Sequence, residues 1–316
     1  MKSEADDHLA RLITAELAAP VPPGAAQIAE LIRQRHGDGV RAILFYGSCL
    51  RTGDDQFSLL DFYVLADSYW NLGTSRLYAA LNALLPPNTY YVKSSAGGRT
   101  VEAKYAVVSL ADFARYTSPR AFQSYFWGRF AQPCALVYAA DDAAAGAVTA
   151  AVATAVATFV QRGLPLVPAP CTVRTLWTTQ LTQSYRAELR AERPAVAERL
   201  YAAAADRYER VTRAALVRLP FPAAAELVNG TTWIAAKAPS AHAAAVWRIR
   251  ILYGRLLHLL RILKSGLTQE GSLDYAIWKV ERHSGLKIDP TWRQKRHPLL
   301  AFGKEAWRMY RKGALR

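Results

Sequence analysis

The residues that could perform chemistry lie in the segment 42–67, AILFYGSCLRTGDDQFSLLDFYVLAD. One hydrophobic run ends at Gly47 and Ser48, and a second opens on Asp61 after twelve intervening residues. Glycine lets the backbone approach a phosphate group closely, and a serine hydroxyl with neighbouring amides can donate to phosphate oxygens. A carboxylate at the start of the next strand can bind Mg²⁺ and so assist phosphoryl transfer. The segment therefore predicts a site for a metal-bound triphosphate.

This spacing is typical of the opening of a nucleotidyltransferase signature, which usually has a second acid two residues after the first. The second acid shares the face of the first because side chains alternate along a strand. Tyr63 holds that position here and cannot replace a carboxylate at neutral pH. A glycine–serine pair followed by an acid also arises by chance, so a non-catalytic protein stays open as an alternative.

Two further candidate site residues, Glu102 and Lys104, lie two positions apart in the segment 100–109, TVEAKYAVVS. This segment is predicted to be a strand beside the one that carries Asp61. Glu102 is a candidate catalytic residue and a second metal ligand. Lys104 is a candidate catalytic residue that contacts phosphate. Lysine is rare here, since residues 1–230 contain three in all. A solvated strand face is the alternative for Lys104.

The hydrophobic pattern predicts the elements that position these residues. Continuous apolar runs over 40–46 and 59–65 predict buried strands, and alternation predicts further strands over 89–93 and 100–109. Periodicity and capping residues predict helices. The order of these elements predicts an α+β fold with a mixed sheet. The predicted helices of this part cover 6–18, 25–35, 75–85 and 110–116.

After the proline-rich segment 163–170 the pattern becomes helical and rich in Ala, Arg and Glu. We place a domain boundary there, with a mixed-sheet domain over residues 1–165 and an all-helical domain over 166–316. The second domain is predicted to end in a basic segment that contacts a membrane. Its predicted helices fall within 173–213 and over 223–237, 241–264, 272–283 and 300–312.

The composition, with 52% hydrophobic and 21% charged residues, is that of a folded globular protein. Three scattered cysteines without a CxxC pair disfavour a disulfide framework and a zinc site, and they fit a reducing cytoplasm. The N-terminal segment is mixed in charge, unlike a signal peptide. The stretch 143–160 is long and uncharged, but Ala and Thr insert weakly into membranes, so we expect a soluble helix packed through small residues.

The positive charge is concentrated in the C-terminal part. Residues 231–316 carry 17 Lys and Arg against 5 Asp and Glu, which is +12 of the net +15. Phosphorylated lipids, a membrane surface and nucleic acid are the candidate partners. We expect 245–264 to be a core helix with a solvated arginine face, and the alternative for it is an interfacial helix on anionic lipid. We expect 297–316, with its aromatic and basic residues, to lie on anionic lipid.

Four blocks carry a family resemblance: YGS at 46–48, LDF at 60–62, KYAVVS at 104–109 and GRFAQP at 128–133. Together they resemble the mitochondrial phosphatidate cytidylyltransferases of nucleotidyltransferase fold, which are peripheral CDP-diacylglycerol synthases. Their order and rough spacing are kept over residues 40–140, and a weaker similarity covers 262–285. That family tends to show a single Asp followed by hydrophobic residues, which accounts for the absent second acid.

The resemblance implies Mg²⁺-dependent transfer of CMP from CTP to phosphatidate, which gives CDP-diacylglycerol and pyrophosphate. It implies an enzyme of phospholipid biosynthesis in the cytoplasm, bound peripherally to the inner face of the membrane. The alternatives are transfer to another lipid phosphate, an RNA end, a protein or a small molecule, and a non-catalytic module that binds nucleotide or lipid. Nucleic acid is the less favoured partner.

The resemblance also implies roles for individual residues. Asp61 would hold the metal, with Glu102 as its candidate partner, and Lys104 would neutralise phosphate. Cys49 departs from the family, which commonly has a second glycine at this position. The resemblance therefore leaves open the conformation of the loop that follows Ser48. The implied substrate-binding residues are Tyr46, Gly47, Ser48, Cys49 and Arg129.

Overall fold

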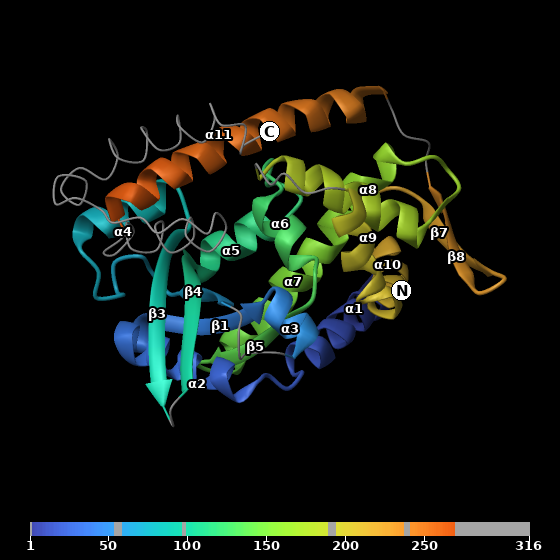
Figure 1. The fold of residues 1–316 in the computed structure, drawn as a ribbon. Helices are drawn as coiled ribbons and strands as arrows, with labels where there is room; N and C mark the ends of the chain where they lie inside the picture. Colours follow the sequence, from blue (N-terminus) through green and yellow to red (C-terminus); the bar gives the residue numbers. More distant parts are fainter. Residues whose placement is uncertain (1, 54–58, 97–98, 189–193, 237–240, 269–316) are drawn as a thin grey trace. The chain divides into compact units, whose positions relative to one another are not determined.

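The computed structural model describes residues 2–53, 59–96, 99–188, 194–236 and 241–268. The first half of the chain contains a mixed five-stranded sheet (Figure 1). The strand order is β3-β4-β2-β1-β5. Strand β2 runs parallel to β4, and the other pairs are antiparallel. The predicted α+β class and mixed sheet are therefore confirmed. The strands are β1 (Val40–Tyr46), β2 (Leu60–Ala66), β3 (Asn88–Ala96), β4 (Arg99–Ser109) and β5 (Cys134–Ala139).

Helices cover both faces of this sheet, which explains why β1 and β2 read as continuous apolar runs. On one face α2 (Pro23–His36) packs Ile28 and Ile32 against Phe45 and Phe62. On the other face Tyr63 joins a cluster with residues of α5 (Leu110–Thr117), α6 (Tyr125–Phe130) and α7 (Asp142–Gly163). The remaining helices of this half are α1 (Lys2–Leu17), η1 (Gly37–Gly39), α3 (Ser48–Thr52) and α4 (Arg76–Leu84).

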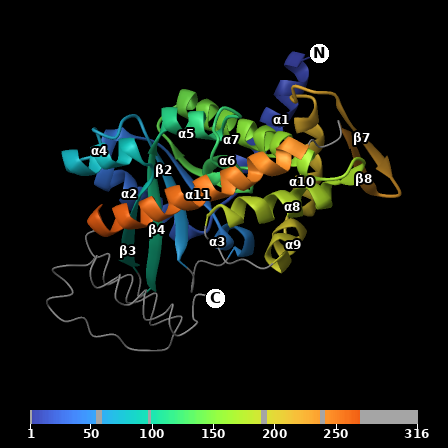
Figure 2. The same ribbon diagram turned by 90° about the horizontal axis from the view of Figure 1, so that it is seen from above.

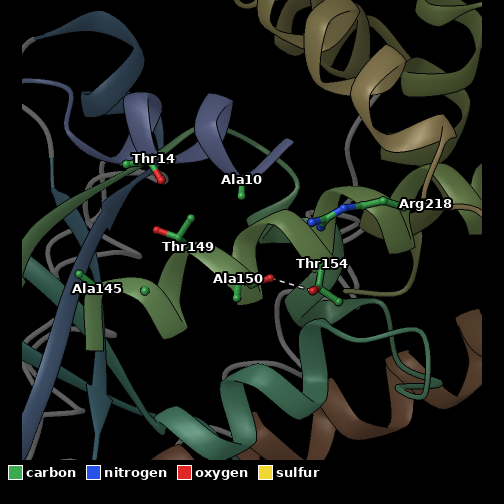
Figure 3. Close-up of a pocket in the computed structure, with 8 residues that line it drawn as sticks. Ala10, Thr14, Ala145, Thr149, Ala150, Thr154 and Arg218 are labelled. Carbon is green, nitrogen blue, oxygen red and sulfur yellow. Dashed lines mark hydrogen bonds between the residues drawn. The ribbon is translucent and has the colours of Figure 1, made fainter. Parts of the chain in front are cut away.

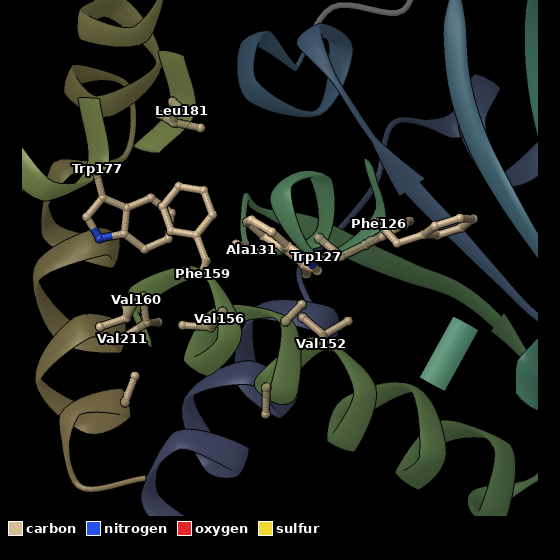
Figure 4. Close-up of a cluster of buried hydrophobic side chains, with 14 of the residues drawn as sticks. Phe126, Trp127, Ala131, Val152, Val156, Phe159, Val160, Trp177, Leu181 and Val211 are labelled. Atoms are coloured by element: carbon tan, nitrogen blue, oxygen red, sulfur yellow. The ribbon is translucent and has the colours of Figure 1, made fainter. Parts of the chain in front are cut away.

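One hydrophobic cluster continues from the sheet half into the helices that follow it (Figure 4). The ring of Phe159 on α7 stacks on Trp177 with centroids 4.3 Å apart, and Trp177 lies 4.2 Å from Tyr208. The boundary predicted between residues 165 and 166 thus falls inside one compact unit, residues 1–258, and a second unit begins at Leu259. The following elements are η2 (Leu164–Leu166), α8 (Val173–Arg186), α9 (Pro194–Ala202) and α10 (Ala205–Leu216).

Helix α7 confirms the prediction of a long helix packed through small residues. Figures 1 and 2 show it beside α1 and α10, and it packs against both. The span Asp142–Leu166 is long and apolar enough to cross a membrane, and 56% of its most apolar window is buried inside the protein. Burial of this kind is also typical of a core helix.

The prediction of a helix over 223–237, and with it of an all-helical second domain, is wrong. Strands β7 (Ala223–Val228) and β8 (Thr231–Ala236) form a hairpin, and β8 also pairs with the short β6 (Cys171–Thr172). Asn229 and Gly230 both have positive φ, at 49° and 77°. This is the turn that an Asn-Gly pair favours between two strands, and it outweighs the helical preference of the alanines.

Helix α11 (Ala241–Thr268) confirms the helix predicted over 241–264. It buries Trp247 and Ile251 and exposes Arg248 and Arg255, as predicted, but it also buries an arginine and exposes large apolar residues. Arg250 is 1% exposed, whereas Ile249 and Leu252 are 59% and 65% exposed. The Arg250 Nε donates to the Phe122 carbonyl at 2.7 Å, and its guanidinium lies 4.5 Å from the Trp247 ring centroid. The predictions for 272–283, 297–316 and 300–312 fall outside the described residues.

Candidate functional site

A row of polar side chains crosses the sheet near the end of β1. In the strand register Tyr46 lies opposite Asp61, Asp61 opposite Lys104, and Lys104 opposite Tyr91. Residues directly opposite one another on paired strands share a face of the sheet. The structure therefore brings Tyr46, Asp61 and Lys104 together, as the sequence predicted, and adds Tyr91 to them.

An ion pair joins the two charged members of the row. Lys104 Nζ lies 2.9 Å from Asp61 Oδ1, and the side chains are 32% and 23% exposed. The carboxylate is thus partly shielded from water, and its Oδ1 already faces a cation. A partly exposed pair of this kind contributes at most about 1 kcal/mol to stability, so stability alone gives little reason for it.

The second carboxylate oxygen of Asp61 faces the turn after β1. A Cβ on Gly47 would lie 3.0 Å from Asp61 Oδ2, closer than side chains normally approach. Gly47 has φ 96° and ψ −159°, a region that residues with a Cβ rarely enter. The turn therefore requires glycine both for its backbone and for its contact with Asp61.

The two residues after Gly47 point in different directions. Ser48 is exposed at the start of α3. Cys49 is 2% exposed and belongs to the cluster under the opposite face of the sheet, with its Sγ donating to the Leu59 carbonyl at 3.5 Å. This packing explains how a side chain is accommodated at position 49. The Cys49 side chain therefore points away from the polar row.

Arg129 lies behind the row, in a cage of tyrosines. Its Nη1 donates to the Tyr46 hydroxyl at 3.0 Å, and its Nη2 donates to Glu188 Oε2 at 2.6 Å. The guanidinium carbon lies 4.6 Å from the ring centroid of Tyr125 and 5.9 Å from that of Tyr63. Burial alone would lower the pKa of Arg129, but Glu188 and the tyrosines raise it well above its usual value. Arg129 is therefore a permanent cation whose charge is balanced inside the protein.

Glu102 lies two residues before Lys104 on β4, on the same face, and it forms an ion pair with Lys93 across the β3–β4 hairpin at 2.9 Å. Within the described residues, no group of three or more His, Cys, Asp or Glu side chains could hold a metal ion. The chemistry of this donor set fits one Mg²⁺ that Asp61 holds and whose other ligands are substrate phosphates and water. It does not fit a cage built from several protein carboxylates.

Sequence reasoning missed three residues of the site: Tyr91, Tyr125 and Glu188. Tyr91 follows from register, because it lies opposite Lys104 once the hairpin is known. Tyr125 was visible as an aromatic residue four positions before Arg129. Nothing in the charged sequence around Glu188 distinguishes it from the other charged residues of that stretch.

A separate open groove of about 360 Å³ lies along α1 and α7 (Figure 3). Small residues and threonine hydroxyls line it, among them Ala10, Thr14, Thr149 and Thr154, with Arg218 beside them. Small side chains of this kind offer no group that would activate a substrate. The polar row is therefore the candidate site.

The comparisons with known proteins do not identify a family. The chain matches no protein-family model, and it matches no curated protein.

Proposed function

We propose that this protein is a Mg²⁺-dependent nucleotidyltransferase that transfers CMP from CTP to phosphatidate or a closely similar lipid phosphate. The observation that carries the proposal is the position of the Asp61 carboxylate, with Lys104 against one oxygen and the Gly47 turn against the other. A carboxylate, a cation and an exposed serine beside a turn without a side chain suit a metal-bound triphosphate.

The connections between the strands support a nucleotidyltransferase fold. The chain leaves β1 through Gly47 and Ser48, passes the short α3, and returns antiparallel on β2, where Asp61 is the second residue. Strand β4 then runs parallel to β2 and supplies Lys104. The turn after β1, the acid on β2 and the lysine on β4 thus come together at one end of the sheet. CTP as the donor comes from the resemblance of the four sequence blocks.

The chemistry assigned to this site is positioning and electrostatics. An oxygen of the lipid phosphate attacks the α-phosphorus of CTP in line, a new P–O bond forms, and the bond to pyrophosphate breaks. Asp61 would hold the Mg²⁺ that neutralises the triphosphate when both are bound. Lys104 stabilises negative charge that develops on the phosphates, and Ser48 donates to a phosphate oxygen. The phosphate nucleophile needs no strong general base.

Helix α11 supports a lipid acceptor and a peripheral position on the cytoplasmic side of a membrane. Within residues 246–256 it exposes an apolar stripe with helical spacing, while Arg248 and Arg255 lie exposed beside the stripe. Apolar residues flanked by arginines suit the surface of an anionic bilayer, where the apolar groups insert and the cations meet lipid phosphates. The stripe consists of Val246, Ile249, Leu252, Tyr253 and Leu256.

One assay tests the proposal. The purified protein is incubated with Mg²⁺, each of the four NTPs in turn, and liposomes that contain phosphatidate, and both pyrophosphate and nucleotide-lipid are measured. We expect both products with CTP, at a rate that depends on lipid. Pyrophosphate without nucleotide-lipid would point to another acceptor. The absence of both products with every NTP would reject the proposal.

A further inference from the structure

Glu188 is a buried carboxylate that takes no part in the chemistry proposed above. Its side chain is 4% exposed, and its Oε2 accepts from Arg129 Nη2 at 2.6 Å. Arg129 is itself only 11% exposed. Burying two charges is costly unless their geometry is good, so a pair this deep calls for a reason other than stability.

Arg129, the partner of Glu188, also contacts the candidate site. The other terminal nitrogen of Arg129 donates to the hydroxyl of Tyr46, the residue before Gly47 and opposite Asp61. With one terminal nitrogen on Glu188 and the other on Tyr46, the guanidinium is oriented by both. A planar guanidinium transmits such orientation well, because its donors form a rigid fork. Arg129 therefore acts on the tyrosine rather than on a phosphate.

The two residues before Glu188 contact α11. Gly254 packs on Ala187 so closely that a Cβ on Gly254 would lie 2.9 Å from both the Cβ and the carbonyl oxygen of Ala187. Arg255 Nε donates to the Arg186 carbonyl at 3.0 Å. The end of α8 is thus fixed by α11 on one side and by Arg129 on the other.

We infer that Glu188 is a positioning residue for the nucleotide turn, acting through Arg129 and Tyr46 and held in place by α11. The expected effect of Glu188 on transfer kinetics rests on the proposed function. The expected effect on the conformation of the turn at Gly47 does not depend on any reaction. Without the charge of Glu188, Arg129 becomes an uncompensated buried cation and turns away from Tyr46. The turn at Gly47 then loses its support next to Asp61.

The test compares Glu188→Gln, Glu188→Asp and the matched control Glu198→Gln. Glu198 also pairs with an arginine, Arg174, at 2.8 Å, but that pair is exposed. The first readout is hydrogen–deuterium exchange of peptides that cover residues 44–50 in the nucleotide-free protein. The second is the kcat and KM for CTP in the transfer assay.

We expect Glu188→Gln to speed exchange over 44–50 at least fivefold and to lower kcat/KM for CTP at least tenfold. Glu188→Asp should recover part of both losses, and Glu198→Gln should stay within twofold of the wild type. Unchanged exchange in both Glu188 variants would overturn the inference, and so would a fall in melting temperature without faster exchange at the turn. If the wild type transfers no nucleotide but Glu188→Gln still speeds exchange over 44–50, the proposed function is rejected and the positioning role of Glu188 remains.

Discussion

The Asp61 carboxylate lies 3.0 Å from the point that a Cβ on Gly47 would occupy. The acid at the start of β2 and the turn at the end of β1 therefore constrain each other. We expect Gly47→Ala to displace the carboxylate and to lower transfer at least a hundredfold. The backbone conformation adds a stability cost of about 1–3 kcal/mol. Transfer kinetics and urea unfolding measure the two effects separately.

Gly53→Ala is the matched control for that substitution. Gly53 also has a positive φ, 69°, but a Cβ there would meet nothing within 4 Å. We expect a loss of about 1–2 kcal/mol from backbone strain and activity within threefold of the wild type. An equal loss of activity in both variants would contradict the specific role of the Gly47–Asp61 contact.

The Asp61–Lys104 pair predicts large functional effects with small effects on stability. Because the pair is partly exposed, Asp61→Asn and Lys104→Gln should each change the free energy of unfolding by less than about 1 kcal/mol. We expect Asp61→Asn to lower transfer at least a hundredfold and Lys104→Gln at least tenfold. The double variant should resemble Asp61→Asn, since the two groups act on one triphosphate. Additive losses would mean that the two residues act separately.

The exposed stripe of α11 predicts liposome binding that depends on its apolar face. Leu252→Glu should weaken flotation with anionic liposomes at least fivefold without affecting the fold, because Leu252 is 65% exposed. Leu77→Glu on α4 is the control, since Leu77 is also 65% exposed but lies outside the stripe. Equal binding of the two variants would remove α11 from the membrane contact.

Two glycine substitutions predict opposite changes in stability. Gly254→Ala should destabilise the protein by about 1–3 kcal/mol, because the added methyl group would overlap Ala187. Gly146→Ala on α7 should stabilise it by up to about 1 kcal/mol, because its Cβ would meet nothing within 4 Å and alanine favours the helix. Chemical denaturation of both variants measures the difference. Two changes of the same sign would contradict the close packing of α11 on α8.

The buried thiols predict a loss of stability at high pH. Burial raises the pKa of Cys171 from 9.0 to about 11, and burial raises that of Cys134 well above its usual range, with nearby Glu16 adding to the effect. Between the two pKa values of each thiol the folded protein keeps a proton that the unfolded chain has lost. The stabilisation is therefore present below about pH 9 and is lost as the pH rises toward 11.

Urea unfolding at pH 8, 9 and 10 measures this loss. In Cys171→Ala the free energy of unfolding should fall less steeply with pH. The cysteines at 49, 134 and 171 should also stay unreactive toward a thiol reagent in the native protein at pH 8, and all three should react after unfolding. Rapid native labelling would contradict their burial.

The strands that carry the site could be predicted because their pattern is local. The run over 40–46 coincides with β1, the run over 59–65 matches β2 to within one residue at each end, and Lys104 lies on the strand that alternation predicts over 100–109. The hairpin at Asn229 and Gly230 was also readable, since the Asn-Gly turn outweighs an alanine-rich composition.

The parts that escaped prediction depend on tertiary contacts. Glu188 meets Arg129 across 59 positions of sequence, and no periodicity connects them. Arg250 reads as a surface residue on a helix, but aromatic rings of Phe122 and Trp247 make a buried place for its guanidinium. Arg250 thus shares the buried face of the helix with Trp247 and Ile251, while Leu252 and Leu256 face outward.

The continuous cluster around Phe159 also has a consequence for the order of synthesis. The sheet and α7 leave the ribosome before Trp177 and Tyr208, which cover Phe159 in the finished protein. At about 5–20 residues per second, α7 stays without this cover for a few seconds. Nascent chains in which α7 has emerged from the ribosome but α8 and α10 have not should therefore recruit chaperones, and chains in which α10 has also emerged should release them.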